Sequence, residues 1–238
     1  MSGELLVVLP VIARATTDIC VDSILMAGSA AGLDRGEILV VDNSRDGWGH
    51  EYGLRTHRDP DGHNLGVARS WNVGVREVLD RDLDYVVLMS ASMRFGPELH
   101  TTWRRQMETF WGHNVIEADG HSWHLIALHR RLFDRIGLFD ENYHVYFEQI
   151  DWCYRLRMAG LEVGFVHVWV NALSQGAALH AHLISCPAEP LLAYYADKWG
   201  GPKGDERYVQ PWGSKPLDYW EPSTIPELAE RYGWTTWW

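Results

Sequence analysis

The most informative stretch of the chain reads Gly137-Leu-Phe-Asp-Glu-Asn-Tyr-His-Val-Tyr-Phe-Glu-Gln-Ile-Asp-Trp-Cys-Tyr-Arg-Leu-Arg-Met-Ala-Gly160. Its first half, with Gly137 and the acid cluster that begins at Asp140, is typical of a turn. From Phe147 to Met158 the apolar residues follow helical spacing. Gly160 suits the position just past a helix C-terminus. The stretch therefore predicts a loop that runs into a helix, with acidic residues at the junction.

Two acids lie in the first turn of this expected helix. Glu148 and Asp151 are three residues apart, so both carboxylates share one face. The helix N-terminus favours their charged forms, and acids held there can bind a polar ligand or take a proton from a hydroxyl. The structural alternative is that they only cap the helix start, with Asp151 paired to Arg155. The spacing leaves both interpretations open.

The bulk properties narrow the class of protein. The chain has 238 residues, an apolar share of 46% and a formal net charge of −11. This charge argues against a general binder of nucleic acid or anionic membranes, but it allows a local basic pocket. The three cysteines show no disulfide or metal-ligand spacing, which indicates a reducing compartment. With no basic signal region and no apolar span long enough for a bilayer, a cytoplasmic protein is expected.

Tryptophan is unusually frequent. The chain contains thirteen, most of them after residue 150. Exposed aromatic rings can stack on sugars or anchor interfaces. They can equally pack a loop-rich C-terminal segment, and the sequence does not separate these two roles.

Short apolar runs alternate with helical patterns, which predicts an α/β fold with a mostly parallel central sheet flanked by helices. Buried strands are expected at residues 5–9, 37–43 and 84–89, an edge strand at 114–117, and further strands at 122–128 and 161–170. Pro10 should end the first strand. Helices are expected at residues 19–31, 67–79, 95–111, 130–136 and 191–199. Ligands of such sheets bind beyond the carboxyl ends of the strands, where Asp42 and Asn43 stand.

Loops and turns connect these elements. Residues 44–62 are rich in Gly, Asp, Arg and His and are expected to form a mobile loop. Asn64 and Gly66 then make a turn that opens a helix, where backbone N–H groups could meet an anion and Arg69 adds a positive charge. Residues 1–200 are expected to form one domain. Residues 201–238 should be a Trp-rich extension that packs on the same domain as an extended wrap.

Four segments of the sequence, taken in their order along the chain, form a recognisable set. They are Val40-Val-Asp-Asn-Ser44, Asn64-Leu-Gly-Val-Ala-Arg-Ser-Trp-Asn-Val-Gly74, the stretch quoted first, and Tyr194-Tyr-Ala-Asp-Lys-Trp-Gly-Gly201. As an ordered set they resemble the family 2 glycosyltransferases, inverting enzymes with the GT-A fold, and most of all the bacterial rhamnosyltransferase-like branch. The resemblance covers most of the chain before residue 200.

The resemblance implies a role for each matching residue. The catalytic base would be Glu148 or Asp151. The donor-binding residues would be Pro10, Asp42, Asn43, Asn64, Gly66, Arg69, Asn72, Ser90, Ser92 and Arg94. The acceptor side would comprise Trp123, Asp140, Lys198 and Trp199.

Two positions depart from the family pattern. Family members usually carry an Asp-x-Asp element after the third strand that holds Mg²⁺ or Mn²⁺, but here the place reads Ser90-Ala-Ser92, and hydroxyls are poor ligands for a hard dication. The need for a divalent metal is therefore open, and Arg69, Arg94, Lys198, Lys203 or Arg207 could supply positive charge in its place. The usual base position holds Gln149, which cannot accept a proton. The histidines at 121–129 and 180–182 are not expected to bind metal.

The resemblance implies transfer of a sugar, with inversion, from a UDP- or dTDP-linked donor to a hydroxyl of a glycan or protein. One alternative is a catalytically degenerate relative that binds nucleotide sugars or glycans. Another is an interaction protein that uses its Trp-rich tail. The sugar, the acceptor and the oligomeric state do not follow from the sequence.

Overall fold

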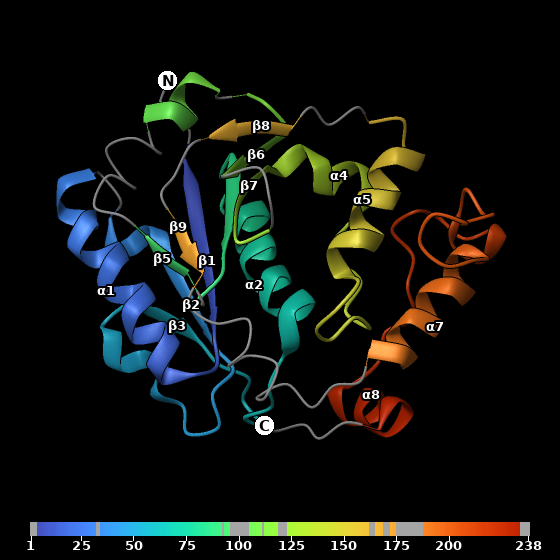
Figure 1. Cartoon of the computed structure of the whole chain (residues 1–238), viewed down its shortest axis with the longest axis horizontal. Helices are drawn as coiled ribbons and strands as arrows, with labels where there is room; N and C mark the ends of the chain where they lie inside the picture. The colour runs from blue at the N-terminus through green and yellow to red at the C-terminus, as the bar shows by residue number, and fades with distance from the viewer. Residues whose placement is uncertain are drawn as a thin grey trace.

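A computed structural model describes residues 4–31, 34–91, 93–95, 105–110, 112–118, 123–161, 165–168, 172–174 and 188–233. Within these ranges the chain forms a central sheet with helices on both faces (Figure 1). No described helix is long and apolar enough to cross a membrane.

Among the described residues, the central sheet has seven strands in the order β3-β2-β1-β4-β7-β6-β8. Their bounds are β1 Leu5–Val11, β2 Ile38–Asp42, β3 Arg55–His57, β4 Tyr85–Met89, β6 Val115–Ala118, β7 Leu125–His129 and β8 Phe165–Val168. Only β7 is antiparallel to its neighbours β4 and β6, so the expectation of a mostly parallel sheet is confirmed. A separate pair joins β5, Met93–Phe95, to β9, Ala172–Ser174.

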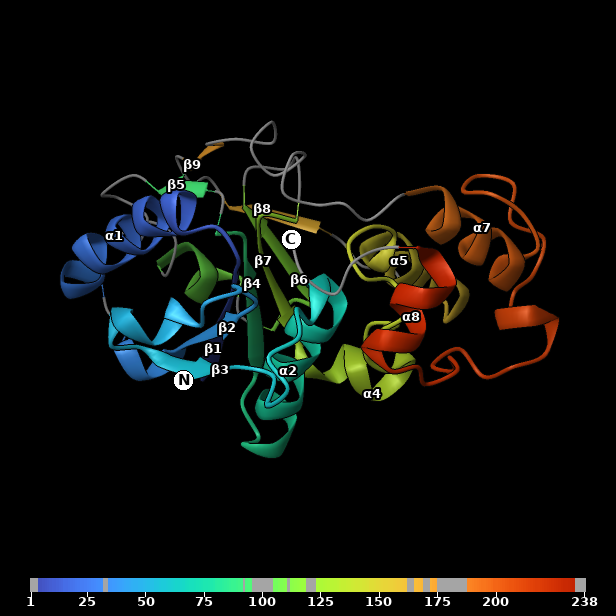
Figure 2. The same cartoon turned by 90° about the horizontal axis from the view of Figure 1, so that it is seen from below.

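Helices cover both faces of this sheet (Figures 1 and 2). On one face lies α1, Arg14–Ala31. On the other lie α2, Gly66–Asp80, then α4, Phe133–Ile136, and α5, Glu148–Met158. Farther from the sheet, beyond α5, is α7, Ala188–Trp199, whereas α8, Ile225–Tyr232, lies near the starts of α5 and α7. Short 3₁₀ turns occupy η1 Arg35–Glu37, η2 Trp48–Tyr52, η3 Arg130–Leu132 and η4 Pro211–Gly213.

Strand β1 shows why its apolar run is continuous. Successive side chains point to opposite faces, so Leu5, Val7 and Leu9 pack on the α1 side while Leu6 and Val8 pack on the α2 side. All five are buried. A strand covered on both faces needs apolar residues at every position.

Helix α2 lies unusually close to β1 at Gly74. A Cβ placed on Gly74 would stand 2.0 Å from Val8 Cγ2, closer than any side chain tolerates. Glycine at this position therefore brings the helix backbone down onto the strand. The contact sets the distance between the α2 axis and the sheet, and so the position of the helix start at Gly66 relative to the sheet.

Several expectations about the elements were wrong. Strand β6 is interior, since it pairs with both β7 and β8. Strand β1 continues through Pro10 to Val11, and α1 begins at Arg14 rather than residue 19. The expected loop at 44–62 contains η2 and β3. Of the helix expected at 95–111, residues 105–109 are helical, whereas 96–104 and 111 lie outside the described residues.

The extended wrap expected beyond residue 209 contains a helix. Thr224 caps α8 through a reciprocal pair with Glu227, and Gly233 follows its end with a positive φ of 69°. Its apolar face is buried, with Ile225 packed into the cluster beneath α2 and Leu228 against Val145. Trp212 and Trp220 are described, whereas Trp234, Trp237 and Trp238 lie outside the described residues.

Candidate active site

The carboxyl ends of β1 and β2 are joined to the start of α2 through Asn43. Its backbone N–H donates to Val11 O at 2.9 Å. Its side chain accepts from Leu65 N at 2.9 Å and donates to Ser70 Oγ at 2.9 Å. One buried amide thus ties two strands to a helix N-terminus at the edge of the sheet where α/β proteins bind ligands.

Asp42 is enclosed rather than open. It is 1% exposed, and its two carboxylate oxygens accept from Ser44 N at 2.9 Å and from Gly49 N at 2.7 Å. Arg58 Nη1 lies 3.7 Å from Oδ1. Arg58 directly follows β3, so it reaches Asp42 across the sheet edge from a distant part of the sequence. The carboxylate shapes the loop from residue 43 to residue 49.

Gly66 holds the loop that precedes α5. Its φ of +71° is a left-handed conformation, and a Cβ there would lie 2.3 Å from His144 O. Only glycine meets both conditions without strain. Asn64 Oδ1 accepts from Gly66 N at 2.8 Å, and Val67 N donates to His144 O at 2.7 Å. The turn expected at Asn64 and Gly66 is therefore present, and its nearest described neighbour is the backbone at His144.

Asn72 fastens the other end of the same loop. Its Oδ1 accepts from Phe139 N at 2.9 Å, and its Nδ2 donates to Phe139 O at 2.8 Å. Arg69, from the first turn of α2, donates to Ser223 O of the C-terminal segment, with Nε 3.8 Å from Glu141 Oε2. We call residues 139–147 the α5 entry loop. The α5 entry loop or the C-terminal segment beside it is therefore in contact with three expected donor residues, namely Gly66, Arg69 and Asn72, while Asn64 holds the turn at Gly66.

Glu148 stands at the end of the α5 entry loop. It is 5% exposed, and its Oε2 has no hydrogen-bond partner among the described residues. Burial raises the pKa of its carboxyl to about 8, although its own backbone N–H opposes the shift. Phe147, just before it, has a positive φ of 73°, which is rare for a bulky residue and marks local strain. A buried, unpartnered acid beside strained backbone is a common property of functional groups.

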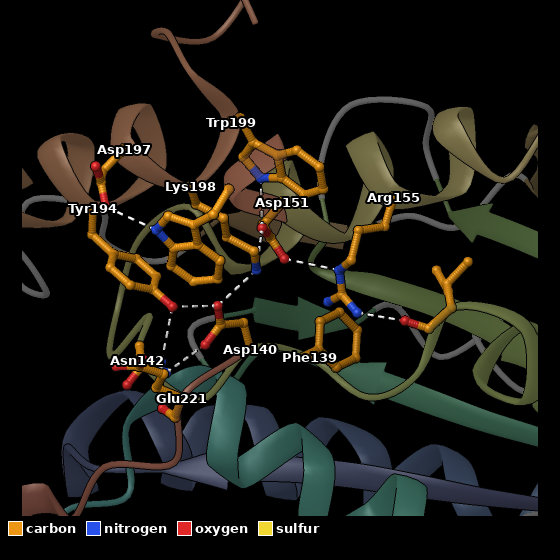
Figure 3. A network of polar contacts seen from close by, with 12 residues as sticks. Phe139, Asp140, Asn142, Asp151, Arg155, Tyr194, Asp197, Lys198, Trp199 and Glu221 are labelled. Atoms are coloured by element: carbon orange, nitrogen blue, oxygen red, sulfur yellow. Dashed lines mark hydrogen bonds and ion pairs between the residues drawn. The ribbon is translucent and has the colours of Figure 1, made fainter. Parts of the chain in front are cut away.

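Asp151 has a different environment, shown in Figure 3. One oxygen accepts from Trp199 Nε1 at 2.8 Å and lies 2.8 Å from Lys198 Nζ, while the other accepts from Arg155 Nε at 2.9 Å. Burial alone would raise the pKa of Asp151, but the cations Lys198 and Arg155 lower it below its usual value. The pairing with Arg155 is the structural alternative that the spacing had left open.

Asp140 completes a buried group of four charges. Its Oδ2 lies 2.7 Å from Lys198 Nζ and accepts from Tyr194 at 2.9 Å. We call Asp140, Asp151, Arg155 and Lys198 the charge quartet. Its two acids and two bases balance, and all four side chains are 0% exposed. The quartet joins the α5 entry loop, α5 and α7 (Figure 3).

Three residues expected on the acceptor side are instead part of the charge quartet or in contact with it. Asp140, Lys198 and Trp199 are fully buried in contact with one another or with Asp151. Lys198 was one candidate for the positive charge that replaces a metal, but its ammonium lies between two carboxylates. Trp123 is partly buried and stacks on Trp71, with ring centroids 5.8 Å apart.

The other expected donor residues lie around the sheet edge. Pro10 is half-buried near the end of β1, and Ser90, just past β4, donates its N–H to His124 O at 2.8 Å. Arg94 is exposed on β5. Ser92 lies outside the described residues. The structure therefore brings Pro10, Asp42, Asn43, Asn64 and Gly66 to one region of the molecule.

Two places among the described residues bear on metal binding. The segment after β4 offers Ser90 and Ala91, which supply no carboxylate, so it does not fit a hard dication. One group, Asp59, Asp61 and His63, places a ligand atom from each residue within 4.8 Å of the others. There Asp59 Oδ1 already accepts the backbone N–H groups of Asp61 and His63, both at 3.1 Å. These contacts show that Asp59 caps the turn at residues 59–63, which explains why the three side chains lie close together.

Some site residues carried no signal in the sequence. Asn142 donates to Tyr194 at 2.9 Å and to Glu221 O at 3.0 Å, and the backbone oxygen of buried His144 accepts from Val67 N at 2.7 Å. Burial, with a smaller contribution from Arg69, lowers the pKa of His144 to about 3. Their partners are far away along the chain, so no local pattern could have identified them. The Asn142 and His144 positions lie within the quoted stretch, and its density of polar residues was the only hint.

Comparisons with known proteins place the fold. No protein-family model matches the sequence, and no curated protein matches it. Among solved structures, a mannosyltransferase from Pyrobaculum calidifontis has a TM-score of 0.55 at 14% identity over 76% of this chain. Glucosyl-3-phosphoglycerate synthase from Mycobacterium tuberculosis has a TM-score of 0.57 at 15% identity, covering 85% of this chain and 82% of its own.

These similarities define the class of fold. The chain has the GT-A fold of nucleotide-sugar transferases, as the resemblance implied. It spans 60% of the length of the Pyrobaculum mannosyltransferase. At such low identity the likeness concerns the fold, and an activity has to be argued from the site.

Proposed function

We propose that this protein is a glycosyltransferase that moves a sugar from a nucleotide-diphosphate donor to a hydroxyl acceptor, with inversion. The observation that carries the proposal is Glu148, a buried carboxyl with a raised pKa and a free oxygen at the N-terminus of α5. It supports the proposal because the fold is one on which nucleotide-sugar transfer occurs. The similar mannosyltransferase was solved with GDP-mannose and Mn²⁺, and the similar synthase with UDP and Mn²⁺. A UDP- or dTDP-linked sugar is our proposed donor.

Glu148 is the proposed base. Inverting transfer needs a group that takes the proton from the acceptor hydroxyl while its oxygen attacks the anomeric carbon. Glu148 Oε2 is free to receive that proton. Asp151 shares the same turn of α5, but three cationic or N–H donors occupy its oxygens. We assign Asp151 a positioning role, in which the charge quartet fixes α5 and thereby Glu148.

The donor is proposed to bind at the carboxyl ends of β1, β2 and β4. Asn43, Asn64 and Gly66 lie near the end of β2 and the start of α2, Pro10 lies near the end of β1, and Ser90 follows β4. Departure of the nucleotide diphosphate places negative charge on its phosphate oxygens, and this charge needs cations or N–H donors. Of the five cations expected to supply it, Arg69 and Lys198 already hold protein partners, whereas Lys203 and Arg207 are exposed in the segment after α7. Arg94 is exposed and is the proposed cation.

The proposal is tested by turnover. Purified protein is incubated with UDP- and dTDP-sugars, and nucleotide release is measured with and without excess EDTA. We expect release that EDTA leaves largely unchanged and that Arg94→Ala reduces. Activity lost in EDTA and restored by Mn²⁺ would show that a metal binds through other residues, and would end the role proposed for Arg94.

A second candidate is a binding module that kept the fold without the chemistry. Gln149 at the family's usual base position and Ser90 in place of a carboxylate favour it. Calorimetry beside the release assay separates the two, since a binding module would bind the nucleotide sugar in calorimetry but release no nucleotide. Such a result would replace the enzymatic proposal.

A further inference from the structure

A cleft lies between α2 and the C-terminal segment, away from Glu148. It has a volume of about 520 Å³, within the range of about 300–1,000 Å³ typical of small-molecule sites. One wall is formed by Arg69 and Arg76 of α2 with Glu141 of the α5 entry loop. The opposite wall is formed by Asp218, Tyr219 and Trp220. We call it the α2–tail cleft.

The charges of the α2–tail cleft cancel. Its walls carry two guanidinium groups and two carboxylates. Arg76 Nη2 is bound to Glu141 Oε1 at 2.6 Å, and Arg69 donates to Ser223 O. A site for a nucleotide diphosphate or another phosphate would present an excess of positive charge. The cleft instead offers both donors and acceptors, which suits a neutral ligand rich in hydroxyl groups.

Aromatic rings form the other part of the lining. Trp220 and Tyr219 are both partly exposed. Tyr219 is held in place by an edge contact with Trp212 at 5.9 Å and by Lys215 Nζ, 4.9 Å from its ring centroid. A pyranose ring presents C–H groups on its faces and hydroxyls around its rim, so it packs on an aromatic ring while bonding to planar polar side chains.

We propose that the α2–tail cleft is a saccharide-binding site. It would hold a part of the glycan acceptor away from the reacting hydroxyl. The link to the reaction centre is the α5 entry loop, because Glu141 lies in the cleft wall and Glu148 directly follows the loop. The acceptor assignment rests on the proposed function, whereas saccharide binding itself does not.

The test is direct binding of neutral disaccharides without any nucleotide. Maltose, cellobiose, lactose and diacetylchitobiose are titrated into the full chain and followed by saturation-transfer NMR. We expect at least one to bind, and Trp220→Ala to weaken it by about tenfold or more, equivalent to about 1.4 kcal/mol. Arg76→Ala, at a half-exposed residue, should weaken it too. Tyr208→Ala removes an exposed ring outside the cleft and should leave binding unchanged.

Three results would overturn the proposal. They are the absence of binding by all four disaccharides, equal affinity of Trp220→Ala and the parent, and binding of inorganic phosphate without any disaccharide. Circular dichroism of each variant checks that it is folded, and Arg76→Ala remains informative if Trp220→Ala is not. Failure of the proposed function is scored separately, since it would appear as absence of nucleotide-sugar binding or turnover.

Discussion

At the scale of single residues, Glu148 and Asp151 show how one turn of helix can hold two acids with opposite properties. Both are buried in α5 and both were equally good base candidates in the sequence. Burial without a partner raises the pKa of Glu148 to about 8. For Asp151 the cations Lys198 and Arg155 outweigh burial and lower its pKa. The difference comes from α7, which no pattern within α5 reveals.

Glu148→Gln should reduce kcat by about 10²-fold or more, because it removes the proposed base. The parent should gain activity as the pH rises through about 8, since a base must be ionised to accept a proton. If Asp151 were the base, its lowered pKa would mean that kcat does not change with pH across that range. Measuring kcat against pH for both proteins distinguishes the two acids. Glu230→Gln, on the exposed side of α8, is the control.

The same substitution should stabilise the protein at high pH. The pKa of Glu148 is about 8 in the folded chain and near 4.5 when unfolded. The unfolded chain therefore loses its proton first, and the free energy of unfolding falls as the pH rises from about 4.5 to about 8. Glu148→Gln removes this loss. Thermal melts should show little difference near pH 4.5 and a more stable variant above pH 8, whereas equal melting temperatures above pH 8 would contradict a buried, unpartnered carboxyl.

At the scale of elements, the α5 entry loop depends on its contact with α2. Gly66→Ala should displace the loop and lower activity strongly, because the new Cβ meets His144 O at 2.3 Å. Gly53→Ala is a matched control, since Gly53 has a similar φ of +63° with no atom within 4 Å of the added Cβ. Both variants carry the same backbone strain. Equal kinetic effects would show that the contact with His144 does not matter.

The charge quartet should make Lys198 important for stability. Lys198→Met leaves Asp140 and Asp151 buried with Arg155, which contacts Asp151, as the remaining cation of the quartet. It should lower the free energy of unfolding by about 3–5 kcal/mol. Lys203→Met is the control at an exposed lysine and should change stability by less than about 0.5 kcal/mol. Urea unfolding measures both. A small loss for Lys198→Met would mean that the two acids become protonated or hydrated at little expense.

The elements that local patterns determine were predicted well. The continuous apolar runs of β1, β2 and β4 and the helical spacing of α2 and α5 were visible in the sequence, as was the helix end at Gly160. Strand β6 was misplaced because pairing on both sides depends on β7 and β8. Helix α8 was missed although Thr224 and Glu227 form a readable capping box, since the Pro and Trp content around it favoured an extended chain. The donor-side residues remain a prediction, and in the structure most of their contacts are with other parts of the protein.

At the scale of the whole molecule, the segment after α7 is part of the packing. Ser223 O accepts from Arg69, Glu221 O accepts from Asn142, and Ile225 enters the cluster beneath α2. A chain ending at residue 200 should therefore melt at a lower temperature than the full chain and bind a hydrophobic dye. An unchanged melting temperature would show that residues 1–200 are stable without the extension.

The balance of charge within the quartet also limits which substitutions this protein can accept during evolution. Each of Asp140, Asp151, Arg155 and Lys198 can be lost only at the risk of leaving a net charge in a dry interior. A neutral replacement of Lys198 becomes tolerable once Asp140 is neutral as well, so the viable route between two such sequences passes through paired changes on α7 and on the α5 entry loop. Laboratory selection that introduces one substitution at a time should leave these four positions untouched, whereas a library that varies Asp140 and Lys198 together should recover apolar pairs.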